Sequence, residues 1–302
     1  MLNWSHVETY NGVVVVDKPS SWTSHDVVNK VRRLVGTKKV GHLGTLDPMA
    51  TGVLPLLVGR ATRLAQFFGK ADKIYEGTIE FGYSTDTYDA EGKPTSEAVP
   101  VTLDRVGIED LLTQFQGRIS QVPPPVSAKK IQGTPAYKLA RRNIEVKLDP
   151  VEVEIYSIEL LRCEAAEIDI RVHCGTGTYL RSIAHDLGRI LGPGAFLKRL
   201  RRTASGGFDL KLARTVEQLA ELSAEGRVAE ALIPAAELLP EFPSELVDST
   251  TAGFIRQGRD FRVSPFRVSG TTKYVKAVSH DGELLAIGEA RLPNVYHPVL
   301  VL

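Results

Sequence analysis

Cysteine is scarce in this sequence of 302 residues, which contains only Cys163 and Cys174. Two cysteines are too few for a disulfide framework, and these two lack the spacing of a metal-binding motif. The chain also has no apolar run near the roughly 18 residues that a membrane-spanning helix requires. Its first residues lack the basic and apolar regions of a signal peptide. We therefore expect a cytoplasmic protein in a reducing compartment, with no membrane contact.

A large excess of charge of one sign is absent as well, since 37 basic and 36 acidic residues give a formal net charge of +1. The hydrophobic fraction of 43% and the charged fraction of 24% are those of an ordinary globular protein. This composition excludes a disordered chain, a collagen-like chain and a small disulfide-stabilised domain. The length corresponds to about two domains of roughly 150 residues each.

The charges are nevertheless separated along the chain. Basic residues outnumber acidic ones by ten to three over residues 18–73, by six to one over 127–147 and by seven to one over 171–202. Residues 215–250 reverse this balance, with eight acidic residues and one basic residue. If the three basic segments converge in space, they form a surface suited to a polyanion. Charge alone leaves open the alternative of three solvated stretches balanced by an acidic face.

Hydrophobic periodicity predicts an α+β fold of strands and helices. Strands are predicted over residues 12–17, 53–58, 74–83, 151–161, 168–174 and 207–210. Helices are predicted over residues 24–35, 61–68, 103–115, 135–142 and 179–191, with acidic helices between 215 and 236. Ser24 and Thr178 are suited to cap the helices that begin beside them. Pro55 favours an edge position or an irregular start for its strand, because proline cannot donate a ladder hydrogen bond.

A boundary between two domains is predicted near residue 240. Pro234, Pro240 and Pro243 mark a linker, and short strands separated by glycine-containing turns follow it. These strands are predicted over residues 261–268, 273–278, 284–290 and 299–302. We therefore expect a larger domain over residues 1–240 and a small all-β domain over residues 245–302.

The most informative segment runs from Gly41 to Pro55 and reads Gly-His-Leu-Gly-Thr-Leu-Asp-Pro-Met-Ala-Thr-Gly-Val-Leu-Pro. Three glycines and two prolines around one acid describe a rigid loop with special backbone geometry. Pro48 pushes Asp47 toward an extended conformation, so the carboxylate projects from the loop. Taken alone, an Asp-Pro pair is typical of an ordinary turn. The whole segment has to decide between a turn and a reactive carboxylate.

The full string resembles the catalytic loop of the TruB family of tRNA pseudouridine synthases at every fixed position of Gly-His-x-Gly-x-Leu-Asp-Pro-x-Ala-x-Gly-x-Leu. Further blocks resemble the same family in the same order: residues 13–24 with Lys18-Pro19, 72–77 with Tyr75, 127–141 with Ser127-Ala128-Lys129-Lys130, and 177–188 with Arg181. The sequence departs from the family at Ser21, where glycine is usual, and at Gly175-Thr176. The C-terminal segment is similar to PUA-type RNA-binding domains.

This resemblance implies a pseudouridine synthase fold, in which helices flank a mixed, mainly antiparallel sheet and a small PUA-like domain follows. It implies isomerisation of uridine to pseudouridine at position 55 in the T loop of tRNA. Such a reaction changes no oxidation state and loses no group, so we expect no cofactor and no metal. We expect tRNA as the partner, no required protein partner, and a monomer.

The resemblance also assigns roles to three predicted catalytic residues. Asp47 acts at the junction of sugar and base, where it attacks C1′, attacks C6 or opens a glycal route. Arg181 pairs with this carboxylate, which would otherwise tend to take up a proton in a dry pocket. Tyr75 offers an aromatic face to the uracil and a hydroxyl near C5. Without the family, a phosphate contact or surface ion pair for Arg181 and an ordinary half-buried strand position for Tyr75 are the simpler interpretations.

The remaining predicted residues contact RNA. A uridine inside folded RNA has to be flipped out, and the resemblance implies that His42 occupies the vacated space. A loop histidine that binds a backbone group is the simpler interpretation of His42 alone. Tyr179 is expected to contact the substrate. Phosphate contacts are predicted for Lys18, Lys129, Lys130, Arg141, Arg142, Arg199, Arg201 and Arg202.

Four alternatives to a stand-alone tRNA enzyme stay open. A synthase of the ribosomal large-subunit type is disfavoured, because that group has His-Arg-Leu-Asp where this sequence has Gly-Thr-Leu-Asp at 44–47. A guide-RNA-dependent relative requires partner proteins. A tRNA-folding chaperone binds the tRNA elbow, with catalysis secondary. A non-RNA α+β protein requires several ordered motif matches to be accidental.

Overall fold

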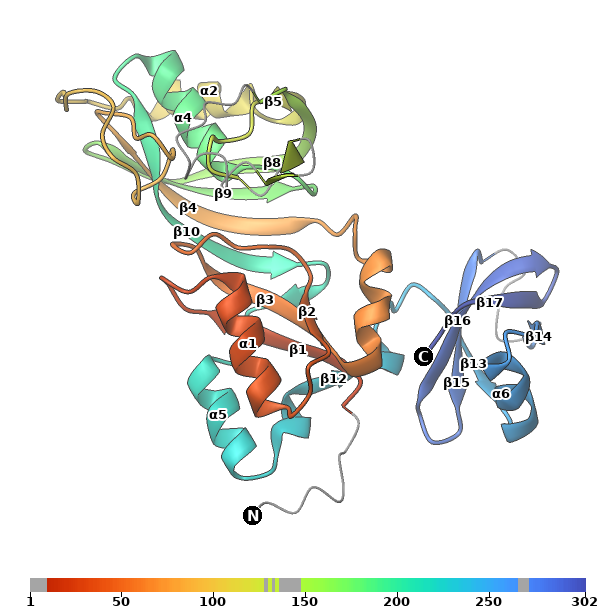
Figure 1. The fold of residues 1–302 in the computed structure, drawn as a ribbon. Helices are drawn as coiled ribbons and strands as arrows, with labels where there is room; N and C mark the ends of the chain where they lie inside the picture. Colours follow the sequence, from red (N-terminus) through yellow and green to blue (C-terminus); the bar gives the residue numbers. More distant parts are fainter. Residues whose placement is uncertain (1–9, 128–129, 132–133, 136–147, 266–271) are drawn as a thin grey trace.

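The computed structural model of this chain describes residues 10–127, 130–131, 134–135, 148–265 and 272–302. These residues form a large mixed sheet flanked by helices, followed by a smaller C-terminal sheet (Figure 1). Two further strands of two residues each, β6 (Lys130–Ile131) and β7 (Thr134–Pro135), pair with each other in a separate small sheet. The helix predicted over 135–142 lies outside the described residues, apart from Pro135.

The large sheet has the strand order β12-β1-β3-β10-β4-β9-β8-β5, with β2 paired to β3 and β11 to β10. Only the β3–β10 pairing among these is parallel, so the predicted mixed, mainly antiparallel sheet is confirmed. Its strands are β1 (Gly12–Lys18), β2 (Val40–His42), β3 (Thr51–Val58), β4 (Lys73–Phe81), β5 (Gly117–Gln121), β8 (Val151–Glu164), β9 (Glu167–Cys174), β10 (Ala195–Ser205), β11 (Phe208–Asp209) and β12 (Leu232–Pro234).

The edge position predicted from Pro55 is wrong, because β3 lies between β1 and both β2 and β10. The Pro55 carbonyl accepts the N–H of Leu43 on the β2 side of the strand. On this side of β3, Pro55 lies between the residues that pair with β2 and those that pair with β10. Its missing N–H therefore leaves no ladder partner unpaired. The sequence also fails to predict β2, β5, β10 and β12 of this sheet, which are short or carry many charges.

The helices of the large unit lie mainly on one face of the sheet. They are α1 (Ser24–Leu34), α2 (Arg105–Thr113), α4 (Leu180–Leu191) and α5 (Val216–Ala224), joined by the 3-10 helices η1 (Gly59–Phe67), η2 (Val228–Ala231) and η3 (Ala235–Glu237). Figure 1 shows α2 and α4 at one end of the sheet and α1 beside α5 at the other. The segment predicted as a helix over 61–68 is thus a 3-10 helix.

Two predicted helix caps are wrong. Thr23, not Ser24, caps α1: its hydroxyl accepts the Asp26 N–H, and the Asp26 carboxylate accepts the Thr23 N–H in return. This reciprocal capping box occupies two unpaired donors of the first turn. The hydroxyl of Thr178 donates to the Gly175 carbonyl instead of capping α4. Tyr179 is the N-cap residue there and makes no side-chain cap hydrogen bond.

The two faces of β1 belong to two different cores, because side chains alternate along a strand. Val14 and Val16 pack in the cluster that includes the apolar faces of α1, α2 and α4. Val13 and Val15 pack in a second cluster with Leu64 of η1 and with apolar residues of the C-terminal unit. The second cluster therefore joins the two parts of the chain.

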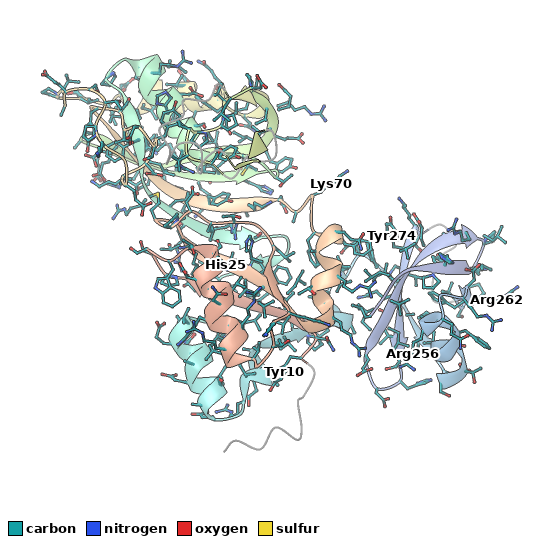
Figure 2. All side chains as sticks on the ribbon, viewed as in Figure 1. Tyr10, His25, Lys70, Arg256, Arg262 and Tyr274 are labelled. Carbon is teal, nitrogen blue, oxygen red and sulfur yellow. The ribbon has the colours of Figure 1, made fainter. Side chains whose placement is uncertain are left out.

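The C-terminal unit is a five-stranded sheet with the order β13-β15-β16-β17-β14 and one helix, α6, that the sequence did not predict. Its elements are β13 (Ser244–Val247), α6 (Ser249–Arg256), β14 (Phe261–Arg262), β15 (Tyr274–Ser279), β16 (Leu284–Leu292) and β17 (Val295–Val301). Figure 2 shows Tyr274 on the side of the C-terminal unit nearest the large unit. Its ring contacts Phe67 of η1 edge-on, with centroids 5.5 Å apart. The division at residues 240 and 245 stays a prediction.

No helix within the described ranges is long and apolar enough to cross a membrane.

Candidate active site

The loop that presents Asp47 connects β2 to β3 and is fixed by buried cations on both sides. The Lys18 side chain has no exposed surface, and its Nζ donates to the carbonyls of Pro19, Trp22 and Pro48 at 2.8, 2.6 and 3.0 Å. Burial lowers the pKa of Lys18 to about 8, although Asp47 nearby acts in the opposite direction. The predicted phosphate contact of Lys18 is therefore wrong, because its ammonium group is enclosed by backbone oxygens.

Arg202 anchors the opposite side of the loop. Its side chain is also fully buried, with Nε donating to the Val53 carbonyl at 2.8 Å and Nη2 to the Gly44 carbonyl at 3.2 Å. Backbone contact is equally close, since a side chain on Gly52, whose φ is +101°, would come within 2.2 Å of the Arg202 carbonyl oxygen. The predicted phosphate contact of Arg202 is wrong because its side chain has no exposed surface, although its buried Nη1 has no hydrogen-bond partner among the described residues.

Arg181 forms the ion pair with Asp47 that the sequence predicts. Arg181 Nε lies 2.9 Å from Asp47 Oδ2, and the arginine side chain is 5% exposed. The other nitrogens of the guanidinium donate to the carbonyls of Thr87 and Val126 at 3.1 and 2.9 Å. The first turn of α4 carries Arg181 to this position. Such a network holds the orientation of the guanidinium as well as its charge.

Asp89 is a second carboxylate on Arg181 that the sequence did not identify. Its Oδ2 lies 3.3 Å from Arg181 Nη1, and the side chain is 5% exposed. Oδ1 accepts the hydroxyl of Thr87 at 2.6 Å and the N–H of Glu91 at 3.1 Å. The surrounding segment is rich in threonine and aspartate, which is typical of a polar turn. Only its contact with α4, about 90 residues later, distinguishes it from an ordinary loop.

The surroundings of Asp47 act on its charge in opposite directions. Burial raises the pKa of Asp47 above its ordinary value, and the like charge of Asp89 raises it further. Arg181 and Lys18 favour the ionised form and so lower this pKa. The carboxylate is thus held in a site where its charge depends on two named cations.

Five predicted site residues line one cavity of about 270 Å³: Asp47, Tyr75, Tyr179, Arg181 and Arg202. Tyr75 comes from β4 and is 8% exposed. Burial raises the pKa of the Tyr75 hydroxyl, and the positive charge of Arg202 opposes this effect. Tyr179 lies at the start of α4, where its backbone N–H and carbonyl bond the side chain of Gln121.

Lys73 also lines this cavity, although the sequence did not single it out. Burial lowers the pKa of Lys73, and Arg202 lowers it further. Its Cε would lie 3.8 Å from a Cβ added to Gly44, so the side chain reaches toward the Asp47 loop. The cavity is thus lined by the Asp47 carboxylate and by three cations, Lys73, Arg181 and Arg202. The position of Lys73 two residues before Tyr75 on β4 could have indicated this, because alternate residues of a strand share a face.

His42 lies apart from this set. It ends β2 and is half-buried, but it does not line the cavity. Burial lowers the pKa of His42, and the neighbouring charges of Arg202 and His25 lower it further. The buried Nδ1 has no hydrogen-bond partner among the described residues. Its predicted role during base flipping stays a prediction.

The other predicted phosphate contacts divide into three groups. Arg201 Nη2 lies 2.8 Å from Asp17 Oδ2, so part of its charge is already paired. Arg199 is exposed, and its Nε donates to the hydroxyl of Thr78 at 3.4 Å. For Lys130 only the backbone is described, and three residues lie outside the described ranges: Lys129, Arg141 and Arg142.

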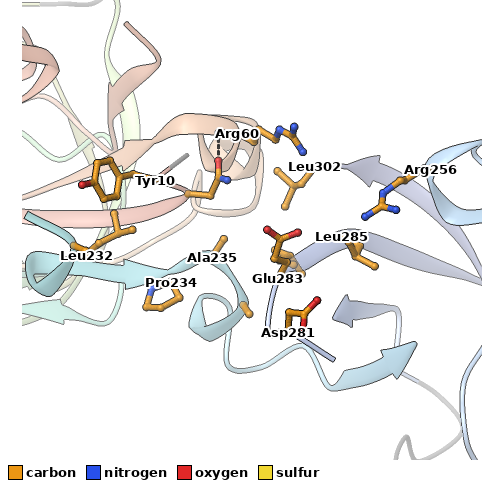
Figure 3. Close-up of a pocket in the computed structure, with 15 residues that line it drawn as sticks. Tyr10, Arg60, Leu232, Pro234, Ala235, Arg256, Asp281, Glu283, Leu285 and Leu302 are labelled. Atoms are coloured by element: carbon orange, nitrogen blue, oxygen red, sulfur yellow. Dashed lines mark hydrogen bonds between the residues drawn. The ribbon is translucent and has the colours of Figure 1, made fainter. Parts of the chain in front are cut away.

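A second cavity, of about 330 Å³, lies between the large unit and the C-terminal unit (Figure 3). Arg60 and Leu232 line it from one side, and Arg256 and Glu283 from the other. None of the three predicted catalytic residues, all of which the structure describes, lines this cavity. Within the described part of the chain, no three histidine, cysteine, aspartate or glutamate side chains gather where they could hold a metal ion.

Comparison with known proteins assigns the chain to a family. Residues 32–180 match the N-terminal domain of TruB family pseudouridylate synthases, and residues 181–240 match a tRNA pseudouridylate synthase B C-terminal domain. The tRNA pseudouridine synthase B of Solibacter usitatus is 58% identical over 292 residues, which cover 97% of this chain and all of that protein. Its counterpart in Thermobifida fusca is 42% identical and covers 93% of this chain and 95% of the relative.

Solved structures show the same fold. A chain of a Cbf5-Nop10-Gar1 complex superposes with a TM-score of 0.68 at 26% identity, covering 96% of this chain and 80% of that one. A chain of an H/ACA RNP bound to a substrate RNA containing 2'-deoxyuridine superposes with a TM-score of 0.70 at 23% identity, covering 100% and 92%. The predicted fold class is thereby confirmed. The chain is an enzyme that belongs to the TruB family of pseudouridylate synthases.

Proposed function

We propose that this enzyme isomerises uridine to pseudouridine at position 55 in the T loop of tRNA, without a cofactor. The observation that carries the proposal is the Asp47 carboxylate, which Arg181 holds at 2.9 Å in a cavity that Tyr75 also lines. The name tRNA pseudouridine synthase B, borne by the relatives from Solibacter usitatus and Thermobifida fusca, supports tRNA as the substrate.

The reaction breaks the bond between N1 of uracil and C1′ of ribose, rotates the base and joins C5 to C1′. The proton on C5 leaves and N1 gains a proton, so atoms and electrons balance without a co-reactant. Attack at C1′, attack at C6 and a glycal route each require an ionised carboxylate beside the sugar. Arg181 and Lys18 favour that ionised form of Asp47.

Tyr75 is proposed to position the base and to accept the proton from C5. Its ring lies against the cavity, and only 8% of the residue is exposed. Because burial raises the pKa of the Tyr75 hydroxyl, this group is neutral near pH 7. A neutral phenol can accept the C5 proton only as it releases its own, and N1 is the atom that gains a proton in the overall balance. Removal of the C5 proton is therefore expected to be a relay that ends at N1.

Base flipping follows from the enclosure of the site. A uridine stacked inside the T loop cannot reach a carboxylate within a cavity of about 270 Å³, so the nucleotide has to be extruded from the RNA. We propose that His42 then occupies the vacated space. The support is that His42 ends β2, just before the loop that presents Asp47.

The test is the release of tritium from C5 of uridine in an unmodified tRNA transcript, without added metal or nucleotide. Wild type should release tritium, and Asp47→Asn should release none while it binds tRNA within a few-fold, because phosphate contacts dominate affinity. A transcript with cytidine in place of uridine at position 55 should release no tritium, because no other uridine is expected to react. Turnover by Asp47→Asn would remove Asp47 from the mechanism, and tRNA binding without turnover by wild type would favour the chaperone.

We also propose that the enzyme acts in the cytoplasm, as a monomer and without a protein partner. Cys163 and Cys174 are both free thiols, which suits a reducing compartment. Light scattering of the enzyme alone and with tRNA should give the masses of one chain and of a complex of one chain with one tRNA. A dimer mass would contradict the monomer.

A further inference from the structure

The ring of Tyr88 lies flat on the imidazole of His185. The ring centroids are 3.7 Å apart and the planes differ by 9°, and both residues are half-buried. Tyr88 belongs to the segment of residues 84–92 that contributes Asp89, and His185 belongs to α4. The following inference rests on the function proposed above, because it concerns how this contact positions the groups around Asp47.

Two residues of α4, Arg181 and His185, meet the segment 84–92 side by side. They are four residues apart, so they project from the same face of the helix. Arg181 donates a hydrogen bond to the carbonyl of Thr87 and forms an ion pair with Asp89. His185 stacks on the ring of Tyr88. Three consecutive residues of the segment are therefore attached to two successive turns of α4.

The backbone of Tyr88 is in the left-handed region, with φ of +65°. This conformation is uncommon and costly for a bulky residue, and it persists only where surrounding contacts impose it. On the far side, the Tyr88 carbonyl accepts the N–H of Leu197 at 3.0 Å, and the Ala90 N–H donates to the Leu197 carbonyl at 3.1 Å. Two bonds to β10 and one stacked ring thus hold the strained turn between β10 and α4.

The His185 ring contacts Tyr88 by stacking and not by a hydrogen bond. Its Nδ1 is buried and has no hydrogen-bond partner among the described residues. Burial lowers the pKa of His185, with Arg189 acting in the same direction and Asp186 in the opposite one. The imidazole is therefore neutral near pH 7, and its flat face against Tyr88 is an aromatic contact between uncharged rings.

We propose that the Tyr88–His185 stack is a positioning contact for catalysis. It holds the segment 84–92 on α4, so that Thr87 and Asp89 keep Arg181 in the orientation that fixes the Asp47 carboxylate. Tyr88 and His185 act through Arg181 and are positioning residues, whereas Asp47 remains the proposed catalytic residue.

The test compares variants of Tyr88 in single-turnover reactions at saturating tRNA. Tyr88→Ala should lower the rate by about 3- to 10-fold, which corresponds to the loss of one aromatic pair. Tyr88→Phe should retain the wild-type rate, because it keeps the ring. Tyr88→Gly, which relieves the backbone strain but removes the ring, should be as slow as Tyr88→Ala. The Kd for tRNA should stay within twofold in each case.

A double-mutant cycle isolates the contact. The double variant with Tyr88→Ala and His185→Ala should be no slower than either single variant, because the second substitution removes nothing further. Tyr156→Ala is the matched control, since Tyr156 also contacts a histidine, His173, with centroids 4.8 Å apart. That pair bridges β8 and β9, and its loss should leave the rate unchanged.

Wild-type rates in both Tyr88→Ala and Tyr88→Gly overturn the proposal. So do additive losses in the cycle, or losses that appear in the Kd for tRNA instead of the rate. Amide hydrogen exchange of Ala90 and Leu197 tests the contact without substrate, and melting curves verify that each variant folds. Faster exchange in Tyr88→Ala supports the contact, whether or not wild type shows turnover. Absence of turnover by wild type would refute only the proposed function. Unchanged exchange overturns the contact.

Discussion

The pKa of a single carboxylate, that of Asp47, is set by several buried charged groups of opposite sign. Burial and Asp89 raise its pKa, while Arg181 and Lys18 lower it. The pKa of Asp47 is thus above that of an exposed aspartate, and its two neighbouring cations favour the ionised form. Electrostatic organisation of this kind makes the rate sensitive to neighbours that never contact the substrate.

The pH dependence of the rate follows from that raised pKa. The proposed reaction requires the ionised form of Asp47, so the single-turnover rate should fall as pH decreases through its pKa, which lies above the ordinary value of 3.8. Asp89→Asn removes a like charge, so its acid limb should move to lower pH, whatever its effect on the maximum rate. Rates measured over about pH 4 to 8 check this. Asp86→Asn, an exposed neighbour, is the control, and an unmoved limb in Asp89→Asn contradicts the prediction.

Lys18 should make stability depend on pH in the alkaline range. Its pKa is lowered in the folded protein from 10.5 to about 8, so the folded chain loses this proton first as pH rises. The unfolded chain then binds more protons, and stability gains with increasing pH between about 8 and 10.5. The unfavourable burial of the charge is fully present below pH 8.

Melting temperatures of wild type and Lys18→Met across that interval provide the measurement. The difference between the two proteins should change in favour of wild type as pH rises. Lys18→Met should also be less stable overall, because three carbonyls lose their donor. Parallel melting curves across the interval count against a buried lysine that titrates there.

At the scale of elements, adjacent residues at the start of α1 have separate tasks. Thr23 caps the helix, whereas the buried hydroxyl of Ser24 donates to the carbonyl of Leu46 at 3.0 Å and accepts its N–H at 2.8 Å. Leu46 immediately precedes Asp47. One residue therefore stabilises the helix, and the next ties that helix to the catalytic loop.

Alanine substitutions should separate these tasks. Thr23→Ala should cost about 1 kcal/mol of unfolding free energy and leave the single-turnover rate unchanged. Ser24→Ala should cost about 1 to 3 kcal/mol, because it leaves the backbone of Leu46 unpaired, and it should also slow the reaction. Denaturant unfolding and single-turnover rates of both variants provide the comparison. A slowed Thr23→Ala, or a Ser24→Ala with the wild-type rate, contradicts this division.

Local pattern decided which elements could be predicted. The Asp47 loop is contiguous, so its glycines, prolines and acid are visible in one segment. The burial of Lys18 and Arg202 is different in kind, because it depends partly on backbone oxygens that folding brings from elsewhere, that of Pro48 for Lys18 and that of Val53 for Arg202. Asp89 was missed for the same reason, since its partner Arg181 lies far along the chain. The Asp47–Arg181 pair itself came from a family pattern and not from periodicity.

At the scale of the molecule, fewer cations are free to bind RNA than the sequence indicates. Lys18 and Arg202 are enclosed by backbone, and Arg201 is paired with Asp17. Arg199 remains exposed on β10. Basic character along the chain therefore overstates the positive surface, because some of these charges stabilise the loop from within.

The salt dependence of tRNA binding should reflect this distinction. Arg199→Gln should make the slope of log affinity against log salt shallower by about 0.7 to 0.9, the range that single strands and duplex DNA give for one phosphate contact. Lys18→Met should leave the slope unchanged, because a buried ammonium releases no counterion. Filter binding at a series of salt concentrations measures both slopes. A shallower slope for Lys18→Met would restore Lys18 as a phosphate contact.

The position of β10 in the sheet determines when the cavity is completed during synthesis of the chain. β10 pairs with β3 and β4, and Arg202 bonds the carbonyl of Val53, 149 residues earlier. A growing chain that has emerged only as far as β9 has its catalytic loop but lacks Arg181, Leu200 and Arg202 in the cavity. Closing so distant a pairing is slow. We therefore expect this cavity to be completed late, only after β10 has left the ribosome and paired with β3 and β4.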